Sequence, residues 1–143
     1  MIVVDANVLI YAYHPRSPFH ERAKHWLETA FAGAEPVRLP WSTILAFLRL
    51  TTNPKVFESP LGIEEAVAAA SAWLDLPTVA PIDPGERYWT ILQKLLVESQ
   101  VTGPLVSDAA LAALAIEHGA TLCSTDRDFK RFEGLKLRNP LET

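Results

Sequence analysis

Four aspartates in this sequence have the residue type and the positions to hold a divalent metal ion together. They are Asp5, Asp108, Asp126 and Asp128. Asp5 and Asp126 each follow an apolar run, and Asp108 opens an alanine-rich segment. Carboxylate oxygens are the hard ligands that Mg²⁺ and Mn²⁺ prefer. A divalent cation held by them activates water and stabilises charge on a leaving oxygen, so these residues indicate phosphoryl chemistry if the fold brings them together.

The elements that must position these acids alternate along the chain. Short β-branched or apolar runs predict strands at 2–5, 36–40, 78–82 and 120–125, with a last edge strand at 135–139. Helical patterns predict helices at 7–14, 19–32, 42–53, 63–75, 84–100 and 107–119, and a helical turn at 126–132. Such alternation predicts an α/β fold with a mainly parallel sheet. Ligands of these sheets bind beyond the carboxyl ends of the strands, where Asp5 and Asp126 stand.

Each acid taken alone has a simpler explanation as a helix cap. Asp5 and Asp126 are plausible N-caps, and Asp108 is placed to meet the positive end of its helix, after a cap at Ser107. Three or four carboxylates in one crevice repel each other, however, and no lysine or arginine stands at the strand ends to neutralise them. We therefore favour a bound divalent cation over capping alone.

The composition sets outer limits on what the protein does. A chain of 143 residues suits a single domain, 1–143, with one sizeable core. No apolar run approaches the length of a membrane span, and the first residues lack the features of a signal peptide, so we expect a cytoplasmic protein that does not enter a membrane. The net charge of −4 argues against a broad basic surface for nucleic acid, but not against a nuclease with an acidic site.

Three stretches of the sequence resemble one known family. "VVDANVLIYA" near the start, "LPWSTILAFLRLTTNP" in the middle and "SDAALAALAIEHGATLCSTDRDF" near the end are similar to the PIN domain. More narrowly, they resemble the VapC ribonuclease toxins of type II toxin–antitoxin pairs. The resemblance covers essentially the whole chain, and the combination of motifs is specific.

The resemblance implies a fold, an activity and partners. The implied fold is a three-layer α/β/α sandwich around a parallel sheet. The implied activity is Mg²⁺- or Mn²⁺-dependent endonucleolytic cleavage of RNA by a metal-activated water, with tRNA or ribosomal RNA as candidate substrates. Asp5, Asp108 and Asp126 match the metal-binding aspartates of the family, and Asp128 matches an additional acid often found there. The implied partners are a small VapB-like antitoxin and a second copy of the chain in a homodimer.

One position departs from the family pattern. Many PIN domains carry a glutamate on the helix after the second strand, and Ala46 stands in its place here. A degenerate PIN domain that binds RNA or a protein without cleaving is therefore the alternative function. If the protein is an enzyme, we expect weakened metal affinity and a larger role for Asp128.

Other polar residues near these motifs have two interpretations each. Arg49 shares a helix face with Ala46 and can bind a phosphate oxygen, or can form a surface ion pair. Asn7 can orient Asp5 or satisfy its own helix start. Thr125 can support the acids or act as a cap. Two groups of basic residues can contribute to an RNA-binding rim: Arg16, Arg22 and Lys24, and Arg127, Lys130 and Arg131.

Overall fold

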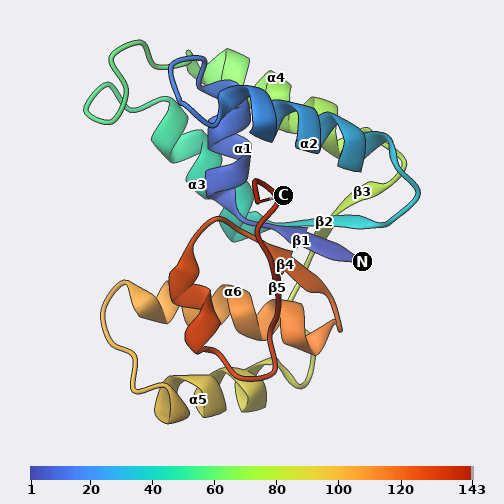
Figure 1. The fold of residues 1–143 in the computed structure, drawn as a ribbon, viewed down its shortest axis with the longest axis vertical. Coiled ribbons are helices and arrows are strands. Elements are labelled where there is room, and N and C mark those ends of the chain that lie inside the picture. Colours follow the sequence, from blue (N-terminus) through green and yellow to red (C-terminus); the bar gives the residue numbers. More distant parts are fainter. Residues whose placement is uncertain (143) are drawn as a thin grey trace.

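The computed structural model describes residues 1–142, which form a parallel sheet with helices on both faces (Figure 1). The five strands are β1 (Ile2–Val4), β2 (Val37–Pro40), β3 (Val79–Ile82), β4 (Thr121–Cys123) and β5 (Lys136–Arg138). The helices are α1 (Ala6–Tyr13), α2 (His20–Ala32), α3 (Trp41–Thr51), α4 (Ile63–Leu74), α5 (Tyr88–Glu98) and α6 (Leu105–Glu117), with a short 3₁₀ helix, η1 (Arg127–Arg131).

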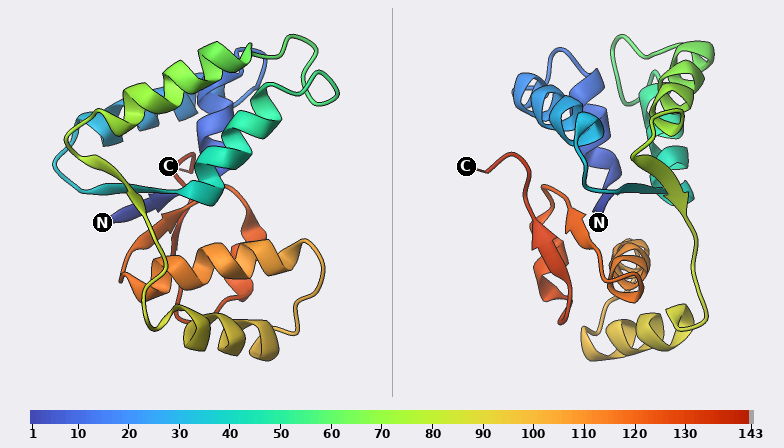
Figure 2. Two further views of the ribbon diagram at one scale, coloured as in Figure 1. Left: turned by 180° about the vertical axis from the view of Figure 1, so that it is seen from behind. Right: turned by 90° about the vertical axis from the view of Figure 1, so that its right-hand side faces the viewer.

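The strands lie in the order β3-β2-β1-β4-β5, and every neighbouring pair is parallel. Helices α1 to α4 lie on one side of the sheet and α5 and α6 on the other, as the views from behind and from the side show (Figure 2). This three-layer arrangement confirms the α/β/α sandwich that the resemblance implied. β5 lies at an edge beside β4, also as expected.

The central strand β1 shows how the sequence builds both layers. All three of its residues are buried, and successive side chains of a strand point to opposite faces of the sheet. Ile2 and Val4 accordingly join the apolar cluster under α1 to α4, whereas Val3 joins the cluster under α5 and α6. A continuous apolar run is what a strand covered on both faces requires.

Two helix starts differ from those expected by more than one residue. α5 begins at Tyr88 rather than Pro84, because the Glu117 carboxylate accepts hydrogen bonds from the backbone N–H groups of Gly85 (2.7 Å) and Arg87 (2.9 Å). These bonds hold the preceding segment outside the helix. α6 begins at Leu105 with Pro104 at the N-cap position, so Ser107 lies inside the first turn and the cap predicted there was wrong.

The far end of α6 was predicted correctly. Gly119 follows the helix with a φ of +65°, a left-handed conformation that glycine adopts without the steric penalty of a Cβ atom. The chain then enters β4 directly, which brings it back to the central strand. Among residues 1–142, no helix combines the length and the apolar character needed to cross a bilayer.

Candidate metal centre

The first and fourth strands bring the acids to one edge of the sheet. β1 and β4 are direct neighbours, and their pairing continues past the strands, where the Asp5 N–H donates to the Cys123 carbonyl at 3.0 Å. Because the strands are parallel, both end at the same edge. Asp5 then caps α1 and Asp126 caps η1, so both acids are caps as well as neighbours across the sheet edge.

The Asp5 carboxylate is held by two hydrogen bonds. Its Oδ1 accepts from the Ala6 N–H at 2.8 Å, and its Oδ2 accepts from the Ser124 hydroxyl at 2.7 Å. Burial raises the pKa of Asp5 above its ordinary value, the two hydrogen bonds oppose that rise, and the nearby Asp126 charge adds to it. The carboxylate is therefore fixed in orientation, and its charged form is disfavoured by partial burial. A nearby cation would stabilise that charged form, as expected for a metal ligand.

Asp108, Asp126 and Asp128 lie close enough to share one ion. One carboxylate oxygen from each can be chosen so that all three lie within 4.8 Å of one another. Asp5 lies outside this group but within its electrostatic reach. Burial, followed by the charges of Asp126, Asp5 and Asp128, raises the pKa of Asp108 to about 6. The structure thus brings three of the four expected acids together and places the fourth beside them.

Only weak compensation for this negative charge comes from the described side chains. Arg131 lies 3.5 Å from Asp128, and its guanidinium slightly lowers the pKa of Asp108. The two residues are three positions apart in the sequence, and Asp128 is 54% exposed. Exposed ion pairs of this kind contribute about 0 to 1 kcal/mol to the free energy of unfolding. A cluster of hard oxygens with so little internal neutralisation fits a divalent cation.

Three polar residues link the acids from beneath. Ser124, which is 1% exposed, donates to Asp5 and accepts from the Asp126 N–H at 3.0 Å. The Asn7 amide donates to the Thr125 hydroxyl at 2.9 Å and approaches that of Ser124 at 3.5 Å. One interpretation of the sequence was that Asn7 orients Asp5 by a side-chain hydrogen bond. In the structure Ser124, not Asn7, donates that hydrogen bond. The role of Ser124 could not be predicted from the sequence, because it depends on β1 and β4 being adjacent.

The side-chain oxygen of Asn7 also bears on the metal. Asn7 Oδ1 is buried, and no described group donates a hydrogen bond to it. Buried acceptors in folded proteins nearly always have a donor. A water bound to a cation is a donor of the right kind, so the donor set and this unpaired oxygen both fit a hydrated divalent ion.

Arg49 and Ala46 lie on α3, which follows β2 as the sequence predicted. Arg49 is exposed, and within residues 1–142 it forms no ion pair, so the surface pair considered for it is not present. Ala46 is half-buried and adds no oxygen to the cluster.

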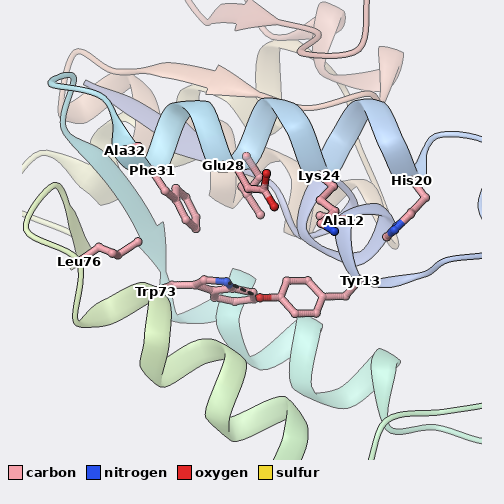
Figure 3. A pocket seen from close by; sticks show the side chains of 10 residues that line it. Ala12, Tyr13, His20, Lys24, Glu28, Phe31, Ala32, Trp73 and Leu76 are labelled. Carbon is pink, nitrogen blue, oxygen red and sulfur yellow. Dashed lines mark hydrogen bonds between the residues drawn. The ribbon is translucent and has the colours of Figure 1, made fainter.

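One cavity lies away from the acids. It measures about 570 Å³ and is enclosed by α1, α2 and α4 (Figure 3). Phe31 and Trp73 form much of its lining, and the Trp73 indole N–H donates to the Tyr13 hydroxyl at 3.1 Å. Its walls are mainly apolar, so it suits an apolar side chain better than a metal or a phosphate.

Comparison with known proteins agrees with this architecture. The PIN domain family matches residues 2–135. Ribonuclease VapC37 of Mycobacterium tuberculosis is 41% identical over 140 residues, covering 98% of this chain and 97% of its own. VapC ribonuclease Mb2897 of Mycobacterium bovis is 38% identical over 142 residues, covering 99% of this chain and 97% of its own.

Solved structures show the same fold at lower sequence identity. VapBC2 of Rickettsia felis, bound to a DNA fragment from its promoter, superposes with a TM-score of 0.71 at 20% identity, covering 97% of this chain and 98% of that one. VapC20 of Mycobacterium tuberculosis, described as a toxin that cleaves the sarcin–ricin loop, gives a TM-score of 0.68 at 18% identity, with 95% and 99% covered.

A parallel α/β sandwich with aspartates gathered at the ends of its central strands is the architecture of a PIN-type protein, and this chain belongs to the PIN domain family. Within that family, its relatives of nearly equal length are VapC ribonucleases.

Proposed function

We propose that the protein is a metal-dependent endoribonuclease and the toxin of a VapBC-type pair, acting as one unit over residues 1–143 in the cytoplasm. The observation that carries the proposal is the cluster of Asp108, Asp126 and Asp128 beside a half-buried, hydrogen-bonded Asp5. Relatives of nearly equal length are named ribonucleases, and one structural neighbour is described as cleaving an RNA loop. A structured RNA, such as tRNA or ribosomal RNA, is therefore the proposed substrate.

In this proposal the aspartates hold Mg²⁺ or Mn²⁺, which when bound activates water for direct attack on a phosphodiester. The metal-binding oxygens come from Asp108, Asp126 and Asp128. Asp5 lies beside them and adds a further negative charge that attracts the cation. Ser124 fixes Asp5 and the Asp126 backbone with one hydroxyl. The unpaired side-chain oxygen of Asn7 would accept a hydrogen bond from a water of the bound ion. Arg49, exposed and without an ion pair in the described chain, is available for substrate phosphate.

A cleavage assay tests the proposal against the non-catalytic alternative. Purified protein is incubated with total tRNA or ribosomal RNA and Mg²⁺ or Mn²⁺, with and without chelator, beside Asp5→Asn and Asp126→Asn. We expect defined fragments that require metal and disappear in both variants. Cleavage that survives chelator and both substitutions would identify a contaminating nuclease, whereas intact RNA under every condition would favour an RNA- or protein-binding module.

The alanine at position 46 leads to a prediction about metal affinity. With no carboxylate on that face of α3, we expect one weakly bound ion in the free protein. Ala46→Glu should tighten Mn²⁺ binding about tenfold, because it adds a charged oxygen ligand where the family carries one. Calorimetric titration of the two proteins measures this, with Ala46→Gln as the uncharged control. Two tightly bound ions in the unmodified protein would contradict the expectation.

We propose a VapB-like antitoxin as the physiological partner. Several structural neighbours are toxin–antitoxin complexes, including VapBC-1 of nontypeable Haemophilus influenzae. An antitoxin that carries a basic side chain would complement the acidic crevice. Copurification with the product of a small gene beside the coding sequence tests this partner, and failure to form a complex with that product would contradict it.

A homodimer is proposed as the quaternary state. α4 buries its alanine face but leaves Ile63 (58% exposed) and Val67 (47% exposed) toward solvent. Light scattering on the isolated protein tests the dimer, and Val67→Glu tests whether α4 forms its interface.

A further inference from the structure

A cleft lies beside Asp126, one acid of the cluster, at the amino-terminal end of η1. Its inner part, about 110 Å³, is lined by Ser124 and Asp126, and its outer part, about 320 Å³, is lined by Tyr11 and Phe19. The two parts share four lining residues, Thr125, Arg127, Asn139 and Glu142. The two parts are therefore adjacent, with Asp126 in the inner part and the aromatic pair in the outer part.

Two arginines from distant parts of the sequence line the outer part of the cleft. Arg22 comes from α2 and Arg127 opens η1, and both line the same cavity and are exposed. Arg22 donates to the Leu141 carbonyl, which leaves its other N–H groups free for a second acceptor. Paired guanidinium groups are the side chains best suited to phosphate oxygens.

An aromatic surface borders the arginines. The rings of Tyr11 and Phe19 lie 5.2 Å apart with a 50° tilt, and Phe19 is 41% exposed although it is a large apolar residue. Unpaired RNA bases stack on exposed aromatic rings of this kind. Phosphate ligands and a stacking surface in one cleft match the two parts of a nucleotide.

The last described residues also occupy this cleft and supply an internal competitor. Leu141 is buried in the core, and its N–H donates to the Asn139 side chain at 2.9 Å, so the segment is anchored. Glu142 is thereby held 4.0 Å from Arg127. Both side chains are exposed, at 64% and 81%, so the pair is weak and a phosphate can replace the carboxylate.

We propose that this cleft binds one nucleotide of a single-stranded RNA segment next to the scissile phosphate, with Arg22 and Arg127 on its backbone phosphate and Phe19 under its base. Glu142 competes with that phosphate for Arg127. The inference rests on the proposed ribonuclease function, and it names the residues that hold the substrate beside the metal centre. The outer cavity is of the size that bound ligands occupy, from about 300 Å³ upward.

Opposite effects on RNA affinity test this arrangement. In an Asp108→Asn background, which prevents turnover, Arg22→Ala and Arg127→Ala should each weaken binding of a fluorescent single-stranded oligoribonucleotide about fivefold to tenfold. Each should also reduce the slope of log affinity against log salt by about 0.7, the value for one lost phosphate contact. Glu142→Gln should instead tighten binding about twofold to fivefold, since it removes a competing carboxylate.

A second exposed arginine–glutamate pair provides matched controls. The sequence grouped Arg16 with Arg22 in a possible RNA-binding rim, but in the structure Arg16 pairs with Glu58 and lines a cavity that shares no residue with the cleft. Arg16→Ala and Glu58→Gln therefore make the same charge changes away from the cleft. We expect both controls to bind RNA as the background protein does. Equal effects of the Arg16 and Arg127 substitutions, or unchanged affinity in Arg22→Ala and Arg127→Ala, would overturn the inference.

The failure of this inference is distinguishable from failure of the proposed function. Metal-dependent cleavage by the unsubstituted protein, combined with unaltered binding in the arginine variants, would retain the ribonuclease and reject the cleft. If the unsubstituted protein does not cleave RNA, the oligonucleotide titrations still decide whether the cleft binds RNA. Thermal unfolding of Arg22→Ala checks that loss of the Leu141 contact has not unfolded the chain.

Discussion

Asp108→Asn should lower RNA cleavage at least about a thousandfold while making the metal-free protein more stable at neutral pH. The loss of activity follows because a neutral amide replaces a charged ligand at the centre of the cluster. The gain in stability follows because burial, followed by repulsion from three neighbouring carboxylates, raises the pKa of Asp108 to about 6 and so disfavours its charged form. Single-turnover cleavage and urea unfolding in chelator measure the two effects.

The raised pKa of Asp108 determines how the free energy of unfolding depends on pH. In the unfolded chain Asp108 has a pKa near 3.8, so the folded state binds this proton more tightly. The free energy of unfolding therefore falls as the pH rises from about 4 through 6, and this loss is absent in Asp108→Asn. We expect the variant to gain about 1 kcal/mol at pH 7, less than the pKa rise alone implies, because solvent screens a partly exposed carboxylate.

Glu98→Gln is a suitable control for Asp108→Asn, since it also neutralises one acid but lies at the end of α5. It should change neither cleavage nor stability appreciably. Destabilisation of Asp108→Asn at pH 7 in chelator would contradict the account of a repulsive cluster. Retained cleavage in this variant would contradict the role of Asp108 as a ligand.

Ser124→Ala should cost about 2 kcal/mol of unfolding free energy at pH 7 and weaken metal binding about tenfold to a hundredfold. The hydroxyl is buried, donates to Asp5 and accepts from the Asp126 N–H, so its removal takes a hydrogen-bond partner from each of two half-buried groups. It also removes the bond that holds Asp5 in orientation, and groups that orient metal ligands typically contribute this much to affinity. Urea unfolding and Mn²⁺ titration measure the two losses.

The destabilisation by Ser124→Ala should shrink at acidic pH. Burial already raises the pKa of Asp5, and loss of its hydroxyl donor raises that pKa further. A protonated Asp5 carries no charge, so loss of the hydroxyl donor costs it less free energy. The destabilisation by Ser124→Ala should therefore be smaller at pH 4 than at pH 8. Ser107→Ala, which removes an exposed hydroxyl next to Asp108, is the control. Equal losses in the two serine variants would contradict the role assigned to Ser124.

The strands and the acids were predictable from local pattern. The run Ile2–Val4 is apolar at every position, which is typical of a strand covered on both faces, and the acids follow such runs directly. The alternation of strands and helices predicted a parallel sheet, whereas the adjacency of β1 and β4 is seen only in the structure. The caps at Asp5 and Asp126 were also expected, and the structure shows that capping and clustering are compatible.

Features that depend on pairs of distant residues were not predictable. Ser124 bonds a carboxylate 119 positions away, and Glu117 delays the start of α5 from the end of another helix. The basic residues after the first helix looked alike in sequence, yet Arg16 pairs with Glu58 whereas Arg22 reaches the cleft beside the acids. Such distinctions arise from tertiary contacts, which no local pattern encodes.

Titration of the metal-free protein with Mn²⁺, followed by electron paramagnetic resonance, tests the central claim most directly. The acidic cluster predicts one ion per chain in the unmodified protein, bound weakly because Ala46 supplies no ligand, and no specific ion in Asp108→Asn or Asp126→Asn. Binding of the same number of ions with the same affinity in the unmodified protein and in both variants would contradict the account.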